Sequence, residues 1–264
     1  MTNVREPPHY ARLRENDADS ILRGMRKIFP PTGVLILVAW SLATALAPLP
    51  PMSGAEFFPL TLHSSWTHRV IFSGGDYLYY MTETVVKDDH PLLEEKRSYV
   101  VVEDYEPLTK KAPRANSTVA YFRKNGFLHR YPWLTSEGNK IWDTKMGTGT
   151  EQILPSPYVG DVTWENNPQT SAWAVDVKQS NTGSAKAWID PVAVEVPVGI
   201  FRNCLRVETV MISRVAGANK VANFRLHFTE WYAKGVGLIK AISSEGEGTP
   251  VKSVTELVWY NVQK

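Results

Sequence analysis

The chain has 264 residues, of which 29 are Lys or Arg and 27 are Asp or Glu, so its formal net charge is +2. Positions 1–55 hold six basic and four acidic residues; subtracting them leaves 23 of each in positions 56–264, which are formally neutral. A neutral body lacks the concentrated positive field that phosphate binding needs, so we expect no nucleic acid as a partner.

The N-terminal region, positions 1–32, is mixed in charge and poor in aliphatic residues, and Pro7 and Pro8 interrupt it near its start. Such a composition buries too little apolar surface to offset the cost of ordering the chain. It predicts a disordered basic region. An unusually long n-region of a signal peptide is the alternative interpretation.

The apolar run that follows, positions 33–47, contains no charged side chain, and Arg23, Arg26 and Lys27 lie just before it. Its backbone can leave water only as a helix. At 15 residues it is shorter than the roughly 20 of a spanning helix and fits the roughly 7 to 15 of a signal-peptide h-region. The basic flank keeps the N-terminal side in the cytoplasm. The sequence therefore predicts that the chain beyond is exported.

Two small-residue sites for signal peptidase follow, one ending at Ala47 and one ending at Ala55. Pro48 disfavours the first because its fixed φ makes a poor extended substrate. We predict that positions 33–55 form the h-region and a Pro-rich c-region, or an uncleaved membrane anchor. Positions 56–264 are then one exported domain, periplasmic or extracellular, and held at the inner membrane through positions 33–47 if the anchor is kept.

The sequence of the exported part predicts an all-β fold, because its apolar residues recur at every second position and it is rich in Val, Tyr, Trp and Thr. We expect an antiparallel, strongly curved sheet, as a half-barrel or sandwich, preceded by the N-terminal signal or anchor helix. Positions 162–170 and 180–184 read as a loop and an exposed turn. The predicted strands are 66–72, 77–86, 97–103, 118–123, 127–131, 139–142, 171–178, 186–189, 193–196, 204–214, 221–232, 237–243 and 253–260.

One hairpin has a specific signal. Asn125-Gly126 separates two apolar strands, and these two residue types tolerate the positive φ values of a type I′ turn. We therefore predict a two-residue turn that joins positions 118–123 to positions 127–131.

The strand at positions 221–232 carries Phe224, Phe228, Glu230 and Tyr232 on one face, which the alternation predicts to be core. An ionised carboxylate on such a face costs several kcal/mol unless it is paired. The simpler explanation is a structural ion pair of Glu230 with Lys240 or Arg206, the three residues being close in a predicted meander. A catalytic acid with a raised pKa is the alternative.

Three pieces occur in order along the exported part: Phe58-Pro59-Leu60 followed by Trp66, the stretch VPVGIFRNCL at positions 196–205, and EWYAKGVGL at positions 230–238. This layout resembles a group of uncharacterised bacterial exported proteins. Their pattern is similar to that of envelope proteins of the LolA/LolB-like type, which implies an antiparallel half-barrel around an apolar cavity. The resemblance implies no catalytic residues.

The chain shows little sequence evidence for chemistry. Its six histidines lack metal-ligand spacing, and no phosphate loop, dinucleotide fingerprint or nucleophile elbow occurs. The single cysteine, Cys204, forms no intramolecular disulfide and is expected to be a small buried hydrophobe. We therefore predict no cofactor and no metal. Paired carboxylates remain conceivable because their separation is spatial, and the candidates are Glu165, Asp176, Glu208 and Glu230.

These features predict a non-enzymatic exported protein that binds an apolar ligand, a lipid or a protein segment in its curved sheet. The predicted ligand-binding residues are Trp66, Phe224, Phe228, Glu230 and Tyr232. An adaptor that contacts envelope proteins through sheet edges and aromatic patches is the alternative. A hydrolase is the third interpretation.

Overall fold

The structure is a computed structural model, and it describes residues 57–73, 78–92, 95–109, 114–137, 140–143, 147–174, 177–216, 221–246 and 248–263. The predicted basic region and the predicted signal or anchor segment lie outside these residues, so both stay predictions. Within the described part, no helix is long and apolar enough to cross a membrane.

The described residues form an all-β structure, as predicted, and every strand pairing in it is antiparallel. The strands of the first half are β1 (Ser65–Phe72), β2 (Leu78–Leu92), β3 (Glu95–Pro107), β4 (Ala115–Lys124), β5 (Phe127–Glu137), β6 (Lys140–Asp143), β7 (Gly147–Thr148) and β8 (Glu151–Pro155). Those of the second half are β9 (Val162–Ala174), β10 (Val177–Asp190), β11 (Val194–Val196), β12 (Gly199–Phe201), β13 (Cys204–Ala216), β14 (Val221–Ala233), β15 (Gly237–Ser244) and β16 (Val251–Asn261).

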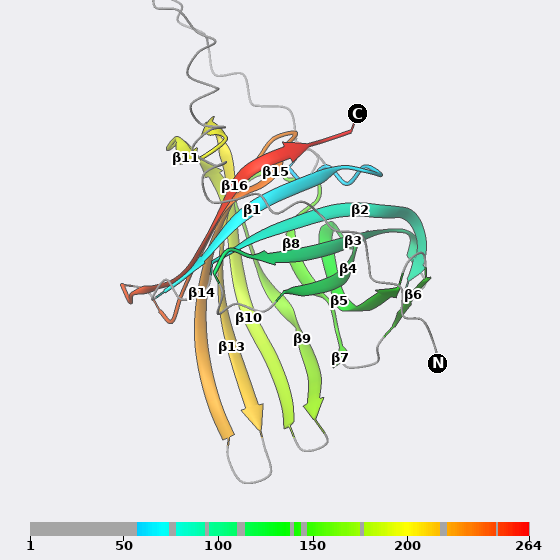
Figure 1. Cartoon of the computed structure of the whole chain (residues 1–264). Helices are drawn as coiled ribbons and strands as arrows, with labels where there is room; N and C mark the ends of the chain where they lie inside the picture. Colours follow the sequence, from blue (N-terminus) through cyan, green and yellow to red (C-terminus); the bar gives the residue numbers. More distant parts are fainter. Residues whose placement is uncertain are drawn as a thin grey trace, which may run out of the picture. The chain divides into compact units, whose positions relative to one another are not determined.

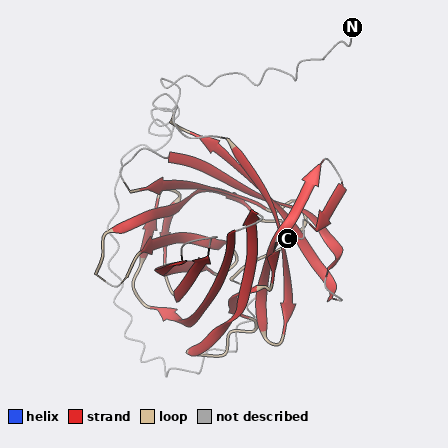
Figure 2. Ribbon diagram, turned by 90° about the horizontal axis from the view of Figure 1, so that it is seen from below, coloured by secondary structure: helices blue, strands red, loops and turns tan. Residues whose placement is uncertain are grey.

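Fourteen strands belong to one sheet, in the order β6-β5-β4-β3-β2-β1-β16-β15-β14-β13-β10-β9-β7, with β8 paired to β5. Strands β11 and β12 form a separate small hairpin. The large sheet curls strongly, as the end-on view in Figure 2 shows. We call β1 to β6 with β8 the first arm, and β9, β10, β13 and β14 the second arm; β16 and β15 join them (Figure 1).

The predicted Asn-Gly hairpin is confirmed. Strand β4 ends at Lys124 and β5 begins at Phe127, and the two turn residues have φ values of 50° for Asn125 and 80° for Gly126. These are the positive values that a type I′ turn requires. The turn sets the register that brings Arg130 onto the inner face of the first arm beside Tyr121.

In the second arm, the predicted strands at 204–214 and 221–232 correspond to β13 and β14, but the prediction was wrong for β9 and β10. Residues 162–170, predicted as a loop, are the first nine residues of β9, and residues 180–184, predicted as a turn, lie inside β10. The predicted strand at 171–178 instead spans the end of β9 and the start of β10. Strands β7, β8 and β12 were not predicted. Polar residues in β9 and β10 removed the alternation on which the prediction depended.

The main core lies inside the curl, at one end of the two arms. The opening segment, with Phe57, Phe58 and Leu60, is buried there. The ring of Phe58 packs against Tyr121 of β4 at 5.0 Å between centroids and against Tyr232 of β14 at 6.1 Å. Since β4 belongs to the first arm and β14 to the second, this one side chain connects both.

Cys204 is fully buried at the start of β13, as the sequence predicted, and burial raises the pKa of its thiol to about 11. A thiol that is protonated and inaccessible does not react as a nucleophile. We therefore expect no reaction of the native protein with Ellman's reagent, and one thiol per chain once urea unfolds it. Rapid labelling of the native protein would contradict the burial of Cys204.

Candidate functional site

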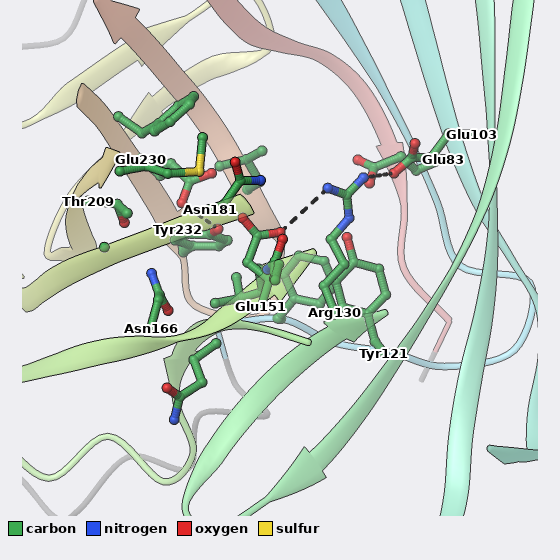
Figure 3. A pocket seen from close by; sticks show the side chains of 18 of the residues that line it. Glu83, Glu103, Tyr121, Arg130, Glu151, Asn166, Asn181, Thr209, Glu230 and Tyr232 are labelled. Carbon is green, nitrogen blue, oxygen red and sulfur yellow. Dashed lines mark hydrogen bonds and ion pairs between the residues drawn. The ribbon is translucent and has the colours of Figure 1, made fainter. Parts of the chain in front are cut away.

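A cavity of about 330 Å³ lies on the concave side of the sheet, next to the core (Figure 3). Both arms line it, so it exists only because the sheet curls. Polar side chains outnumber apolar ones among its lining residues, and apolar atoms provide slightly more of the wall's surface. The residues that line it are Phe58, Met81, Glu83, Glu103, Tyr105, Tyr121, Arg130, Glu151, Gln152, Ile153, Asn166, Gln169, Asn181, Thr182, Gly183, Thr209, Met211, Phe228, Glu230, Tyr232 and Leu238.

Side chains along a strand point alternately to its two faces, and this alternation explains how charged residues come to face the cavity. On β2, Glu83 pairs with Glu103 of β3, and Met81 pairs with Tyr105. Directly opposed residues on antiparallel strands project to the same face of the sheet. The register of one strand pair therefore places two carboxyl groups side by side on the concave face.

Arg130 of β5 is the cation of the cavity wall. Its guanidinium lies 2.8 Å from Oε1 of Glu103 and 3.7 Å from Oε2 of Glu151. The carboxylate of Glu103, with only 4% of its side chain exposed, also accepts hydrogen bonds from Ser117 and from the Tyr105 hydroxyl. Burial favours the neutral acid, but the charge of Arg130 and these hydrogen bonds outweigh it and lower the pKa of Glu103.

Glu83 has a different environment. Burial raises the pKa of its carboxyl to about 8; the charge of Glu103 adds to the rise, and Arg130 opposes it. The neighbour on its other side is His68, whose Nδ1 lies 3.4 Å from Oε2 of Glu83. The Nε2 of His68 donates to the carbonyl of Leu238 at 2.9 Å, and burial lowers the pKa of the ring to about 4. Glu83 and His68 are therefore both neutral at pH 7 and do not form an ion pair.

Glu230 reaches the cavity from the second arm. Burial, helped by the nearby charge of Glu151, raises the pKa of its carboxyl to about 7. The hydroxyl of Tyr232 donates to it at 3.1 Å, which, with Arg130, opposes the rise. The cavity thus contains two carboxyl groups, Glu83 and Glu230, that retain protons near neutral pH. The carboxyl of Glu103 is ionised and paired with Arg130.

The remaining polar wall is uncharged. Asn166 and Gln169 from β9 and Asn181 and Thr182 from β10 provide amide and hydroxyl groups to the cavity wall, and Figure 3 shows Asn166 and Asn181 among them. Amides both donate and accept hydrogen bonds, so this wall suits a ligand of mixed polarity. Gly183 follows Thr182 on β10, and a Cβ at this position would lie 2.4 Å from the Val210 carbonyl oxygen of β13.

The raised pKa values predict how stability depends on pH. Between about pH 4.5, the ordinary value of a Glu carboxyl, and pH 8, Glu83 and Glu230 hold protons in the folded state that the unfolded chain has lost. The folded state binds more protons, so their contribution to stability falls as pH rises through this window. Glu83→Gln removes one contributor. Because one pKa unit corresponds to about 1.4 kcal/mol, we expect the effect of Glu83→Gln on the free energy of unfolding to be more favourable at pH 8 than at pH 4.5 by at least about 2 kcal/mol.

Urea denaturation of both proteins at the two pH values measures this difference. Glu208→Gln is the matched control, because Glu208 lies on the convex face and pairs with Arg206. An equal effect of Glu83→Gln at both pH values would contradict the assignment of a raised pKa to Glu83.

The structure places the predicted ligand-binding residues in different surroundings. Phe228, Glu230 and Tyr232 line the cavity. Trp66 is buried in the core, where its Nε1 donates to the Val236 carbonyl. Phe224, although on the same face of β14, is 50% exposed near the far end of the strand. The face predicted to be core is therefore core only near Tyr232.

The predicted ion pair of Glu230 does not form. Glu230 is opposite Ala241 on the concave face, whereas Lys240 and Arg206 are both register partners of Trp231 and lie on the convex face. There Lys240 pairs with Glu256 at 3.2 Å, and Arg206 pairs with Asp190 and Glu208. The period-two alternation separates Glu230 from both cations.

Sequence reasoning missed Glu83, Glu103, Glu151 and Arg130. Glu103 had a usable signal, since it alternates in phase with Tyr99, Val101 and Tyr105 as Glu230 does with its aromatic neighbours. The opposite face of β3 is equally apolar at Val100, which is buried in a second, smaller cluster. The pattern therefore could not decide which face was concave.

Of the other carboxylates proposed from the sequence, Glu165 and Glu208 do not line the cavity, and Asp176 lies outside the described residues. Within the described part of the chain, no group of three or more His, Cys, Asp or Glu side chains is placed to hold a metal ion.

An apolar groove of about 520 Å³ adjoins the cavity on the first arm. The rings of Phe72, Tyr79 and Tyr105 follow one another along it with centroid separations of 6.2 Å. Tyr105 lines both the groove and the cavity. A polar site and an aromatic surface therefore meet at this residue.

No protein-family profile matches the sequence, and no curated protein matches it. A candidate lipoprotein from Parabacteroides distasonis has a similar structure, with 16% identity, a TM-score of 0.43, and coverage of 80% of this chain and 100% of that chain. A candidate exported protein with a YmcC-like fold from Bacteroides fragilis has 10% identity and the same TM-score of 0.43 and coverage of 80% and 100%. At these values neither indicates what this chain binds. The three-motif layout described above stays a prediction.

Proposed function

We propose that the protein is an exported, non-enzymatic binding protein whose concave cavity holds a small ligand rich in hydrogen-bond donors. The observation that carries this proposal is the polar cavity of about 330 Å³ between the two arms. Its volume is within the usual range for ligand sites, at the small end. Buried polar groups normally have partners, and the acceptors of this wall would find theirs in a ligand.

Export rests on the sequence. The uncharged run at positions 33–47, with basic residues before it, has the length and flanks of a signal h-region or a short anchor. A binding protein beyond such a segment would meet its ligand in the periplasm or outside the cell.

The apolar ligand predicted from the sequence is best accommodated in the groove rather than in the cavity. Phe72, Tyr79 and Tyr105 provide an aromatic surface that would suit an acyl chain or an apolar protein side chain. The charged cavity itself disfavours a purely apolar occupant, because that occupant would strip water from four carboxyl groups without replacing their hydrogen bonds.

One observation favours a hydrolase as a second candidate. Glu151 and Glu230 line the same cavity, and burial and the Glu151 charge raise the pKa of Glu230 to about 7. A carboxyl group whose pKa is raised towards neutrality beside a second acid is typical of the general acid of a hydrolase. The adaptor alternative rests on exposed aromatic residues such as Trp259 and stays a prediction.

Native mass spectrometry of the full-length protein tests the binding proposal, followed by extraction and identification of small molecules that travel with it. A cavity-filling variant, Thr209→Trp, provides the comparison, because Thr209 lines the cavity from β13. The matched control is Thr229→Trp, which carries the same change on the convex face of β14.

We expect a bound small molecule in the parent protein and in Thr229→Trp, and its loss in Thr209→Trp. A ligand-free mass for the parent, with no rise in melting temperature on adding small polar molecules, would overturn the proposal. Turnover of a glycoside or ester probe that Glu230→Gln abolishes would instead favour the hydrolase.

A further inference from the structure

We infer that the ligand of this cavity carries an organic cation, an ammonium or guanidinium group, that lies beside Glu83 and Glu230. The inference rests on the proposed function and names the chemical class of the ligand at the same site. It follows from the charges, the partners and the orientation of the side chains in Figure 3.

The first step is the balance of charge. The cavity wall contains four carboxyl groups, those of Glu83, Glu103, Glu151 and Glu230, and one cation, Arg130. The guanidinium of Arg130 already contacts both Glu103 and Glu151. The wall therefore has no second cation to compensate the other two carboxyl groups.

The second step concerns Glu83 and Glu230 themselves. No cation of the described chain lies within ion-pair distance of Glu230, since Lys240 and Arg206 are committed to acids on the convex face. Among the described residues, His68 is the basic side chain in contact with Glu83, and its buried ring is neutral at pH 7. The charge of Arg130 also acts on Glu83, but Glu103 and Glu151 already share that charge. Removing a carboxylate from water without a partner is costly, and these two avoid that cost by remaining protonated.

A third and independent observation is an unpaired acceptor in the cavity wall. The Oε1 of Gln152 is buried and has no hydrogen-bond partner among the described residues, and Gln152 lines the cavity. A buried acceptor without a partner points to an absent donor, and an amide oxygen can accept from an ammonium. Tyr121, which is 95% buried (5% exposed), lies next to Arg130 (Figure 3), and the rings of Tyr121, Tyr232 and Phe228 add faces that attract cations.

The ligand cation is expected to be organic. The described carboxyl groups are not arranged as a metal site. The cavity volume of about 330 Å³ is far larger than one metal ion needs, and amides and aromatic rings complete its wall. Such a mixture of carboxyl, amide and aromatic groups suits an amine joined to a hydroxylated or apolar body.

The inference has a thermodynamic consequence that can be measured. A cation placed beside Glu83 and Glu230 favours their ionised forms and so lowers both pKa values, which are about 8 and about 7 in the free protein. Binding at pH 7 should therefore release protons, on the order of one per ligand. A neutral ligand at the same site would release none.

Matched probes test the inference on the full-length protein. We would measure the melting temperature with glucosamine against glucose, putrescine against 1,4-butanediol, and phenethylamine against 2-phenylethanol, each at 10 mM. For any pair that fits the cavity, the amine is expected to raise the melting temperature and the alcohol is not. Isothermal titration in two buffers of different ionisation enthalpy then counts the protons released.

Two variants locate the effect. Glu230→Gln and Glu83→Gln keep the shape of the protonated side chains, so both should fold, but neither can ionise. We expect each to weaken amine binding by at least tenfold and to reduce proton release, while the convex-face control Glu208→Gln leaves both unchanged.

The outcomes separate this inference from the proposed function. An alcohol that stabilises the protein as much as its amine, or amine binding that Glu230→Gln and Glu83→Gln leave intact, would overturn the cationic ligand while leaving a binding cavity in place. If no amine stabilises the protein, the inference also fails, and the native mass spectrum of the parent and Thr209→Trp still decides the proposed function.

Discussion

Replacing Phe58 with Ala is expected to lower the free energy of unfolding by about 4 kcal/mol, the largest effect of any single change considered. Phe58 is buried and contacts rings from three strands, Trp66 of β1, Tyr121 of β4 and Tyr232 of β14. Its removal leaves a space that cannot collapse, because two arms of a hydrogen-bonded sheet hold its walls apart. Urea denaturation followed by tryptophan fluorescence measures the loss.

Phe224→Ala is the matched control for this variant. The same atoms are removed, but Phe224 is half exposed on β14 and the change should cost less than about 1 kcal/mol. Equal destabilisation by both variants would mean that Phe58 does not hold the arms together.

Replacing Arg130 with Met should lower the free energy of unfolding by about 3 kcal/mol. The substitution retains the length of the side chain but leaves the buried carboxylate of Glu103 without its cation. Two hydrogen bonds, from Ser117 and Tyr105, remain and offset only part of the penalty. The measurement is again the free energy of unfolding in urea.

A double-variant cycle identifies the cause. With Glu103→Gln added, the acid left without Arg130 is Glu151, whose side chain is 34% exposed and can reach water. The double variant should therefore be more stable than Arg130→Met by about 2 kcal/mol. If the second change gives no recovery, the loss in Arg130→Met comes from packing rather than from the buried charge.

The sequence predicted the fold class and most strands of the first arm because those strands have apolar alternation and one unambiguous turn. Asn125-Gly126 defined the hairpin of β4 and β5 correctly, since few other residue pairs adopt its backbone angles. Both signals depend on residues that are close in sequence, so they can be recognised without knowledge of the tertiary structure.

Strands β9 and β10 of the second arm were predicted poorly for a reason that concerns the site. Asn166 and Gln169 of β9 and Asn181 of β10 lie on the concave face, where the alternation rule expects apolar side chains. The strands that were mistaken for a loop and a turn are therefore strands that line the cavity. A polar segment between predictable strands is, in this chain, a sign of the site.

The site itself was predicted only in part. Glu230 was singled out because its neighbours on one face are aromatic, and the structure places it in the cavity. Its predicted partners were wrong, because closeness along a meander does not reveal on which face a side chain lies. The cluster with Glu83 and Arg130 depends on pairing between distant strands, which one sequence does not specify.

The two ends of the large sheet also bear on self-association. One end is β6, with four residues, and the other is β7, with two, beside a β9 that contains Pro168. Strand β7 pairs with only Thr170 and Ser171 of β9, so much of that strand is also an edge, and there Pro168, which has no amide hydrogen, interrupts the row of donors that a neighbouring copy could use. A sheet this wide would otherwise be prone to edge-to-edge aggregation, so its ends help the protein to stay soluble at high concentration while its interior remains open to a ligand.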